Sequence, residues 1–216
     1  KKKEAADPGE GKTRITVSVL PQQYFVRRIA GDKAIINVMI PPGHSPATYE
    51  PTPLQMRDVS DSDIYFRIGH IPFEKVWMGN IKAANPEMKM IDTSRGVRLI
   101  RSGSAQEAED EHEQHASGET AHSHDHRGID PHIWLSPAAV KVQAKNILTA
   151  LSRFDPANKA FYENNYRTFA GDIDRLHEEL NNLFTDLQSN KIMVFHPAWS
   201  YFARDFNLLQ IAIEVE

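Results

Sequence analysis

Histidine is the residue type whose use in this chain points to chemistry. The sequence has ten histidines and no cysteine, which excludes thiolate metal sites, disulfides and cysteine nucleophiles. A neutral imidazole is a good ligand for Zn²⁺ and related transition ions, whereas Mg²⁺ and Ca²⁺ need a shell of oxygen atoms. Three imidazoles and one carboxylate around a common point would form a tetrahedral Zn²⁺ site.

Four histidines lie where such a site is expected. His44, His70 and His196 each follow a short apolar run with the character of a strand, and His132 lies just before a predicted helix start. Open α/β sheets bind their ligands at the carboxyl ends of the strands. For any one of these histidines, a hydrogen bond to a loop carbonyl is an equally good explanation. Taken together, the four favour a metal site.

A second group of histidines lies in residues 103–128, which contain no aliphatic side chain larger than alanine. Such a segment cannot bury enough apolar surface to fold, so we expect a long, mobile, acidic loop. Imidazoles and carboxylates clustered on a mobile chain bind transition metals weakly and in several arrangements, and a merely solvated acidic loop is the alternative. The histidines of this metal-collecting loop are His112, His115, His122, His124 and His126.

The sequence offers little for catalysis. It contains no HExxH, GxSxG, Walker or GxGxxG motif. Glu74 is the one candidate for a general base beside the histidines, and a role as a helix-capping or ligand-supporting acid is the preferred interpretation. His177 lies in a predicted helix beside Glu178 and is assigned a structural or surface role.

The elements around these residues are predicted from short-range patterns. Short β-branched runs predict strands at residues 15–20, 34–40, 63–68 and 88–92, separated by segments that could hold helices, as in a parallel α/β sheet. Ser136-Pro137 predicts a helix start, because serine caps helices and proline suits the first turn. Asp155-Pro156 repeats this signal, and apolar steps of three and four then predict a helix to about residue 189, or ~50 Å. A strand at 191–195, a helix at 197–206 and a strand at 208–215 follow.

These patterns predict an α/β protein with two lobes, each a parallel sheet flanked by helices, joined by one long rigid helix. The expected units are a flexible tether (1–12), an N-terminal lobe (13–154), a linking helix (155–190) and the start of a C-terminal lobe (191–216). A sheet of two strands is too small to be complete, so the second lobe is expected to be truncated. The net charge of −4 gives no electrostatic footprint for nucleic acid. No apolar run approaches the ~20 residues of a membrane-spanning helix.

Four motifs, in this order, carry a resemblance to a known family. PPGHSPATYEPTP, YFRIGHIPFE, DPHIWLSP and VFHPAWSYFARDFNL resemble the metal-binding substrate-binding proteins of ABC importers, the zinc and manganese uptake group. The acidic, histidine-rich segment before DPHIWLSP resembles the zinc members in particular. The similarity runs from about residue 13 to residue 215.

The resemblance implies metal in a cleft between two lobes, with His132 and His196 as ligands. The first ligand of the family lies in a PGxxPHxYEP loop, where this chain has Ala47. His70 is the preferred replacement because Gly69 lets the backbone turn at the end of a strand, and His44 or a water molecule are the alternatives. The acidic fourth ligand of the family would lie beyond Glu216.

The function implied is capture of a divalent transition metal, Zn²⁺ rather than Mn²⁺, and its delivery to an ABC permease. The implied location is the periplasm or the cell surface, with a lipid anchor as one means of attachment, and the expected state is a monomer. Two other functions stay open from the residues alone. A zinc-dependent hydrolase would use three histidines and an open water position, and a soluble metal buffer or chaperone would use the histidine-rich loop.

Overall fold

The computed structural model describes residues 11–101 and 128–213, so most of the predicted tether and the five loop histidines lie outside the described residues. The first lobe contains a four-stranded sheet in the order β2-β1-β3-β4, with every neighbouring pair parallel. Its strands are β1 (Thr13–Val19), β2 (Ala34–Ile40), β3 (Ile64–Arg67) and β4 (Lys89–Asp92). This confirms the predicted parallel α/β class.

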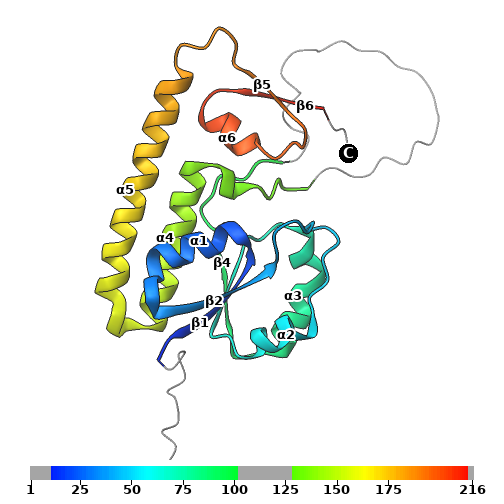
Figure 1. Ribbon diagram of the computed structural model, residues 1–216, viewed down its shortest axis with the longest axis vertical. Coiled ribbons are helices and arrows are strands. Elements are labelled where there is room, and N and C mark those ends of the chain that lie inside the picture. The colour runs from blue at the N-terminus through cyan, green and yellow to red at the C-terminus, as the bar shows by residue number, and fades with distance from the viewer. Residues whose placement is uncertain (1–10, 102–127, 214–216) are drawn as a thin grey trace, which may run out of the picture.

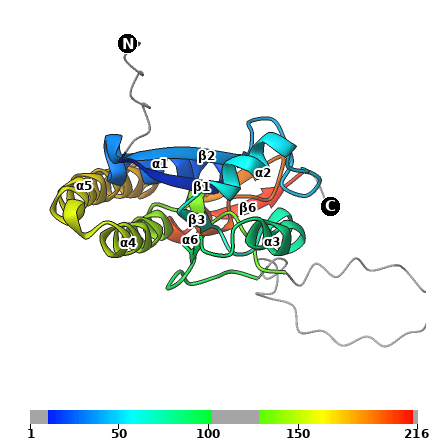
Figure 2. The ribbon, with the colours of Figure 1, turned by 90° about the horizontal axis from the view of Figure 1, so that it is seen from below.

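Helices cover both faces of this sheet, and successive residues of β3 show why. Ile64 and Phe66 contribute to one buried cluster, whereas Tyr65 contributes to the other, as the two-residue period of a strand requires. The first face is covered by α1 (Leu20–Ala30) and α4 (Pro137–Phe154), with α5 packed outside them. The second face is covered by α2 (Pro53–Ser60) and α3 (Pro72–Ala84). Figure 2 shows the strands between these two groups of helices.

The start of α4 follows the predicted signal. The Ser136 hydroxyl accepts a hydrogen bond from the Ala139 backbone N–H at 3.0 Å, and Pro137 is the first helical residue. A short 3-10 turn, η3 (Ile133–Leu135), leads into it from His132. The chain then runs along α4 and returns along the neighbouring helix α5 (Figure 1).

The linking helix is shorter than predicted. Residues Pro156–Asn158 form a 3-10 turn, η4, and the α-helix proper, α5, spans Lys159–Phe184 instead of residues 155–190. Its 26 residues extend about 39 Å rather than ~50 Å. Leu183 and Leu187 continue the apolar stripe but are 66% and 45% exposed. Because a helix in a protein is held mainly by packing of its apolar face, the unpacked end of the stripe does not prolong it.

The second lobe is described as far as residue 213. Strands β5 (Lys191–Val194) and β6 (Leu209–Ala212) form a parallel pair, joined by the short helix α6 (Ser200–Asp205). In Figure 1 this unit lies beside the first lobe, and α5 runs along the edge of both. Within the two described ranges, none of the helices combines the length and apolar character needed to cross a membrane.

Candidate metal centre

Two of the predicted ligands, one from each lobe, lie side by side. The ring centroids of His132 and His196 are 5.3 Å apart, with the ring planes at 77°. His132 lies at the start of η3 in the first lobe, and His196 follows β5 in the second. Residues 64 positions apart in the sequence therefore meet at the junction of the lobes.

A buried acid fixes how His132 presents its ring. The Asp130 carboxylate lies 2.7 Å from His132 Nδ1 and also accepts the His132 backbone N–H at 2.9 Å. Asp130 is 5% exposed. With Nδ1–H donated to the carboxylate, the lone pair of Nε2 is free for a metal ion, and the carboxylate makes the imidazole a more basic ligand. The Trp134 ring packs edge-on at 5.1 Å and restricts the imidazole further.

The sequence interpretation did not identify Asp130 as a functional residue. The sequence did contain a signal for this role, because an acid two residues before a candidate ligand is close enough to accept hydrogen bonds from its ring and its backbone N–H. Metal-binding histidines usually donate their second ring N–H to such a partner.

His70 lies three residues after the end of β3, on the turn where the strand pattern placed it. Gly69 has a φ of +104°, and a Cβ there would lie 2.9 Å from Ser94 Oγ and 3.1 Å from Asp92 Oδ1. Both the dihedral angle and the contact require glycine at this turn. Partial burial lowers the pKa of His70, against the opposing effect of the Asp92 charge, so the ring keeps its neutral, metal-binding form to lower pH.

The structure does not complete the predicted three-histidine group. Over residues 11–101 and 128–213, no three His, Asp or Glu side chains are arranged to hold one metal ion. The expectation that His70, His132 and His196 converge on one point is therefore not met. The assembled part of the site is the His132–His196 pair, and His70 lies on a separate turn.

Glu74 supports the turn that carries His70. Its carboxylate, 3% exposed, accepts hydrogen bonds from the backbone N–H of Ile68 at 2.7 Å and of Gly69 at 2.6 Å. A third bond comes from the Ser18 hydroxyl at 2.5 Å. Burial raises the pKa of Glu74, while these three donors act in the opposite direction. A carboxylate enclosed in this way holds a loop and has no open face toward water, so the structure does not favour it as a general base.

His44 lies on the exposed loop after β2, where its ring packs edge-on against Tyr49 at 5.1 Å. Ala47, at the position of the family's usual ligand, is also exposed on this loop. His177 faces the second lobe from α5, with its ring 5.0 Å from that of Phe206. The structural role expected for His177 agrees with this packing.

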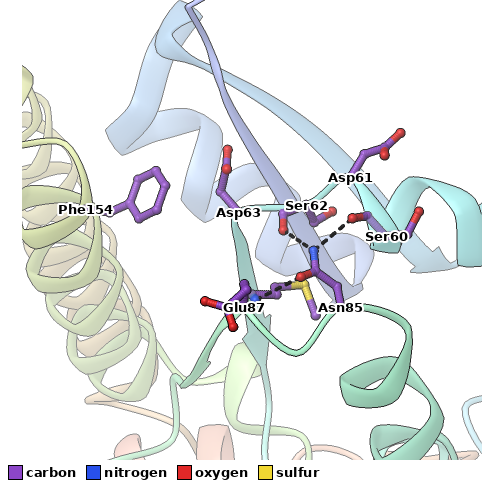
Figure 3. Close-up of a pocket in the computed structure, with 8 residues that line it drawn as sticks. Ser60, Asp61, Ser62, Asp63, Asn85, Glu87 and Phe154 are labelled. Carbon is purple, nitrogen blue, oxygen red and sulfur yellow. Dashed lines mark hydrogen bonds between the residues drawn. The ribbon is translucent and has the colours of Figure 1, made fainter.

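A surface cavity of about 240 Å³ lies in the first lobe at the amino-terminal ends of β3 and β4, the opposite end of these strands from His70. Figure 3 shows its lining, which includes Asp61, Asp63 and Glu87 but no histidine. The Asn85 amide donates to the backbone carbonyls of Ser60 at 2.9 Å and Ser62 at 2.8 Å, so it joins two loops. These residues precede β3 and β4, whereas open α/β sheets bind ligands at the carboxyl ends of their strands. This cavity is therefore not the candidate metal centre.

Comparison with solved structures and curated proteins shows which proteins this chain resembles. A structure described as "Crystal structure of ZnuA" is 40% identical, with a TM-score of 0.80, and is matched over 95% of this chain and 71% of that one. A zinc-bound deletion mutant of ZnuA (residues 138–173) has the same identity and coverage and a TM-score of 0.81. The high-affinity zinc uptake system protein ZnuA of Bacillus subtilis (strain 168) is 27% identical over 98% of this chain.

The chain spans 64% of the length of that Bacillus subtilis relative. A family profile described as zinc-uptake complex component A, periplasmic, matches residues 15–216. The match covers nearly the whole chain, and the fold agrees with it. The chain therefore belongs to the ZnuA family.

Proposed function

We propose that this protein captures Zn²⁺ at the junction of its two lobes and delivers it to the membrane permease of an ABC importer. The observation that carries the proposal is the pair His132–His196, in which each lobe contributes one imidazole at a ring separation of 5.3 Å. A metal ion bound by both lobes is released when the lobes or their loops shift relative to each other. Such a site suits capture and delivery.

The proposed ligand set is His132 through Nε2, His196 and His70, whose separate turn has to move toward the pair when the metal binds. His70 takes the place of the loop histidine for which this chain has Ala47. A carboxylate outside the described residues would complete a tetrahedron. A site dominated by imidazole favours Zn²⁺ over the oxygen-preferring Mn²⁺, and the solved ZnuA deletion mutant is described as zinc-bound.

The family description supports a periplasmic location, and a relative named as the zinc-binding lipoprotein AdcA of Streptococcus pneumoniae supports attachment at the cell surface as the alternative. A single copy supplies both members of the histidine pair, so we propose a monomer as the working form. A hydrolase is the less favoured function, because Glu74 is occupied by three hydrogen-bond donors.

Alanine substitution of the histidines tests the ligand set. Loss of one of four ligands should cost ~3–4 kcal/mol of binding free energy, which is roughly a 100- to 1,000-fold rise in Kd for Zn²⁺. We expect this for His132→Ala, His196→Ala and His70→Ala. For His44→Ala we expect a change of less than about threefold, because its ring packs on Tyr49 in an exposed loop. Competition with a chromophoric chelator measures each Kd.

A matched control is His177→Gln, which removes an imidazole from α5 and should leave the Kd unchanged. Wild-type affinity in His132→Ala or His196→Ala would remove that residue from the site. A large loss in His44→Ala with none in His70→Ala would reverse the choice of the third ligand. Turnover of an ester or peptide by the zinc-loaded protein would favour the hydrolase.

A further inference from the structure

Helix α6 belongs to the second lobe by sequence and packs Ala203 into the apolar cluster of that lobe, but other side chains of the helix are anchored in the first lobe. Tyr201 is fully buried and is part of the same apolar cluster as residues of β2, α2 and α3. Its hydroxyl donates to the Asp130 carbonyl at 2.7 Å and accepts from the Ile100 backbone N–H at 3.1 Å. Both bonds cross between the lobes; the bond to Asp130 is buried and the bond from Ile100 is partly buried.

The last turn of α6 adds two more links to the first lobe. Asp205, whose side chain is 7% exposed, accepts a hydrogen bond from the Ser136 hydroxyl, the same group that caps α4. Next to it, the Arg204 guanidinium donates to the Arg98 carbonyl at 2.7 Å. We call the side chains of Tyr201, Arg204 and Asp205 the α6 tie.

The α6 tie connects the two histidines of the pair through a short path. The Asp130 backbone carbonyl accepts a hydrogen bond from the Tyr201 hydroxyl. The Asp130 carboxylate in turn contacts the ring Nδ1 and the backbone N–H of His132. On the other side, His196 precedes Tyr201 by five residues, in the turn between β5 and α6. Tyr201 and Asp130 therefore form a short link between the two imidazoles. The chain also connects His132 to His196 through α4 and α5, but this path is much longer and enters β5 at Lys191, the end away from His196.

We propose that Tyr201 is a positioning residue of the metal site, whose hydroxyl fixes the His196 turn against the Asp130–His132 turn and so preorganises the two imidazoles. The inference rests on the proposed function, because it concerns the same two ligands. Ligands held in place lose little freedom when the metal binds, whereas ligands on loosely joined lobes must be ordered at that moment. Groups that support metal ligands typically contribute 10- to 100-fold to metal affinity.

The test is Tyr201→Phe, which keeps the buried ring and removes only the hydroxyl. We expect about a tenfold rise in the Kd for Zn²⁺. The visible spectrum of the Co²⁺-loaded protein should also change, since its bands report the geometry of the ligands around the ion. Both measurements use the full chain, well below its melting temperature.

Tyr162→Phe is the matched control. Tyr162 is also fully buried and its hydroxyl also makes a good hydrogen bond, to Asp155 at 2.7 Å, but it lies at the start of α5 in the other core cluster. Both variants should lower the melting temperature, and only Tyr201→Phe should alter the Kd and the Co²⁺ spectrum. Equal Kd values and spectra in the two variants would overturn the positioning role.

The experiment separates this inference from the proposed function. If the wild-type protein lacks a tight Zn²⁺ site, or if His132→Ala binds as well as wild type, the proposed function fails. If His132→Ala loses affinity for Zn²⁺ while Tyr201→Phe keeps both the wild-type Kd and the wild-type Co²⁺ spectrum, only the positioning role of Tyr201 fails. A Tyr201→Phe protein that does not fold is replaced by Asp205→Ala, which leaves the Ser136 cap of α4 in place. This variant removes a different link of the α6 tie and should also raise the Kd.

Discussion

At the scale of single residues, the side chains that could bind metal were easier to predict than those that hold them. His196 and His70 were placed at strand ends from short apolar runs alone, and both lie there. Asp130 and Glu74 act on backbone N–H groups and on an imidazole that come close only after folding. A supporting role for Glu74 is the preferred interpretation of the sequence, and the structure adds the hydrogen bonds that it makes. Asp130 lies only two residues before His132, but the sequence interpretation did not use that spacing, so its role is a finding of the structure.

Substitution of Glu74 by glutamine tests its role in the turn after β3. A glutamine oxygen can still accept from Ile68 N–H, but its NH₂ group faces the Gly69 N–H, donor against donor. A buried N–H without a partner costs about 1–3 kcal/mol, so the metal-free variant should be less stable by that order. Urea unfolding of both proteins in the presence of chelator measures the difference.

The pH dependence of that difference has a definite sign. Burial raises the pKa of Glu74 above its usual 4.5, so the folded state binds this proton more tightly than the unfolded state. The contribution of the carboxyl to stability is then complete below pH 4.5 and is lost as the pH rises through the folded value. The cost of Glu74→Gln should be larger at about pH 5 than at about pH 7.5. The opposite trend would mean a lowered pKa, and the exposed control Glu87→Gln should show neither effect.

At the scale of elements, the strands of the first lobe were predicted better than the end of the long helix. Ser136 caps α4 as its sequence signal requires, and strands β1 to β4 lie within two residues of the predicted ranges. The end of α5 was placed too late because its apolar period continues past the last turn that has anything to pack against. The apolar period of a helix shows which of its faces would be buried. Only the tertiary structure shows where the surface that packs against this face ends.

The turn between α4 and α5 carries a testable contribution from Asp155. Its carboxylate accepts from Asn158 N–H at 3.3 Å, from the Asn158 side chain at 2.7 Å and from the Tyr162 hydroxyl at 2.7 Å. Asp155→Ala should destabilise the protein by about 1 kcal/mol at neutral pH, as loss of a helix cap does. The Tyr162 hydrogen bond is the largest cause of a lowered Asp155 pKa.

The sign of the pH effect is opposite to that at Glu74. With the folded-state pKa of Asp155 below its usual 3.8, its stabilisation is present above that value and is lost as the pH falls through the folded pKa. Urea midpoints of wild type and Asp155→Ala should therefore approach each other in strong acid. Asp186→Ala, an exposed acid just after α5, is the control and should have no effect. A constant gap at all pH values would contradict a role for the charge.

At the scale of the whole molecule, the sequence predicted two α/β lobes joined by one long rigid helix, but not the side-chain contacts between the lobes. In the structure, Tyr201 is buried in a cluster of the first lobe and Asp205 bonds to the cap of α4, so the closest links lie beside the histidine pair. Such contacts could not be predicted, because a buried tyrosine in a six-residue helix carries no sequence sign of the lobe that buries it.

The last prediction concerns removal of the histidine-rich segment, which lies outside the described residues. Arg101 and Ile129 form an antiparallel bridge, and Asp130 N–H donates to the Ile100 carbonyl at 2.9 Å, so the chain leaves and returns at adjacent positions. Deleting residues 103–127 joins Ser102 to Gly128 and leaves a two-residue connection across this bridge. Connections of two residues with a glycine are favoured between antiparallel neighbours. The first lobe should therefore fold without the segment.

The deletion should keep the tight Zn²⁺ site, with a Kd within about threefold of wild type, and should lower the number of ions bound at high zinc. The proposed ligands of the tight site lie on turns of the described structure, whereas the sequence of the segment is not expected to build a preorganised site, so its imidazoles should bind weakly. Equilibrium dialysis with metal analysis measures both the affinity and the number of ions bound.

A control variant, in which only the five histidines of the segment become serine, keeps the length of the segment. If that control loses the tight site as well, the segment supplies a primary ligand and the set His70, His132 and His196 is wrong. If the deletion alone loses it, the connection across Arg101 and Ile129 has displaced Asp130 and, with it, the ring of His132.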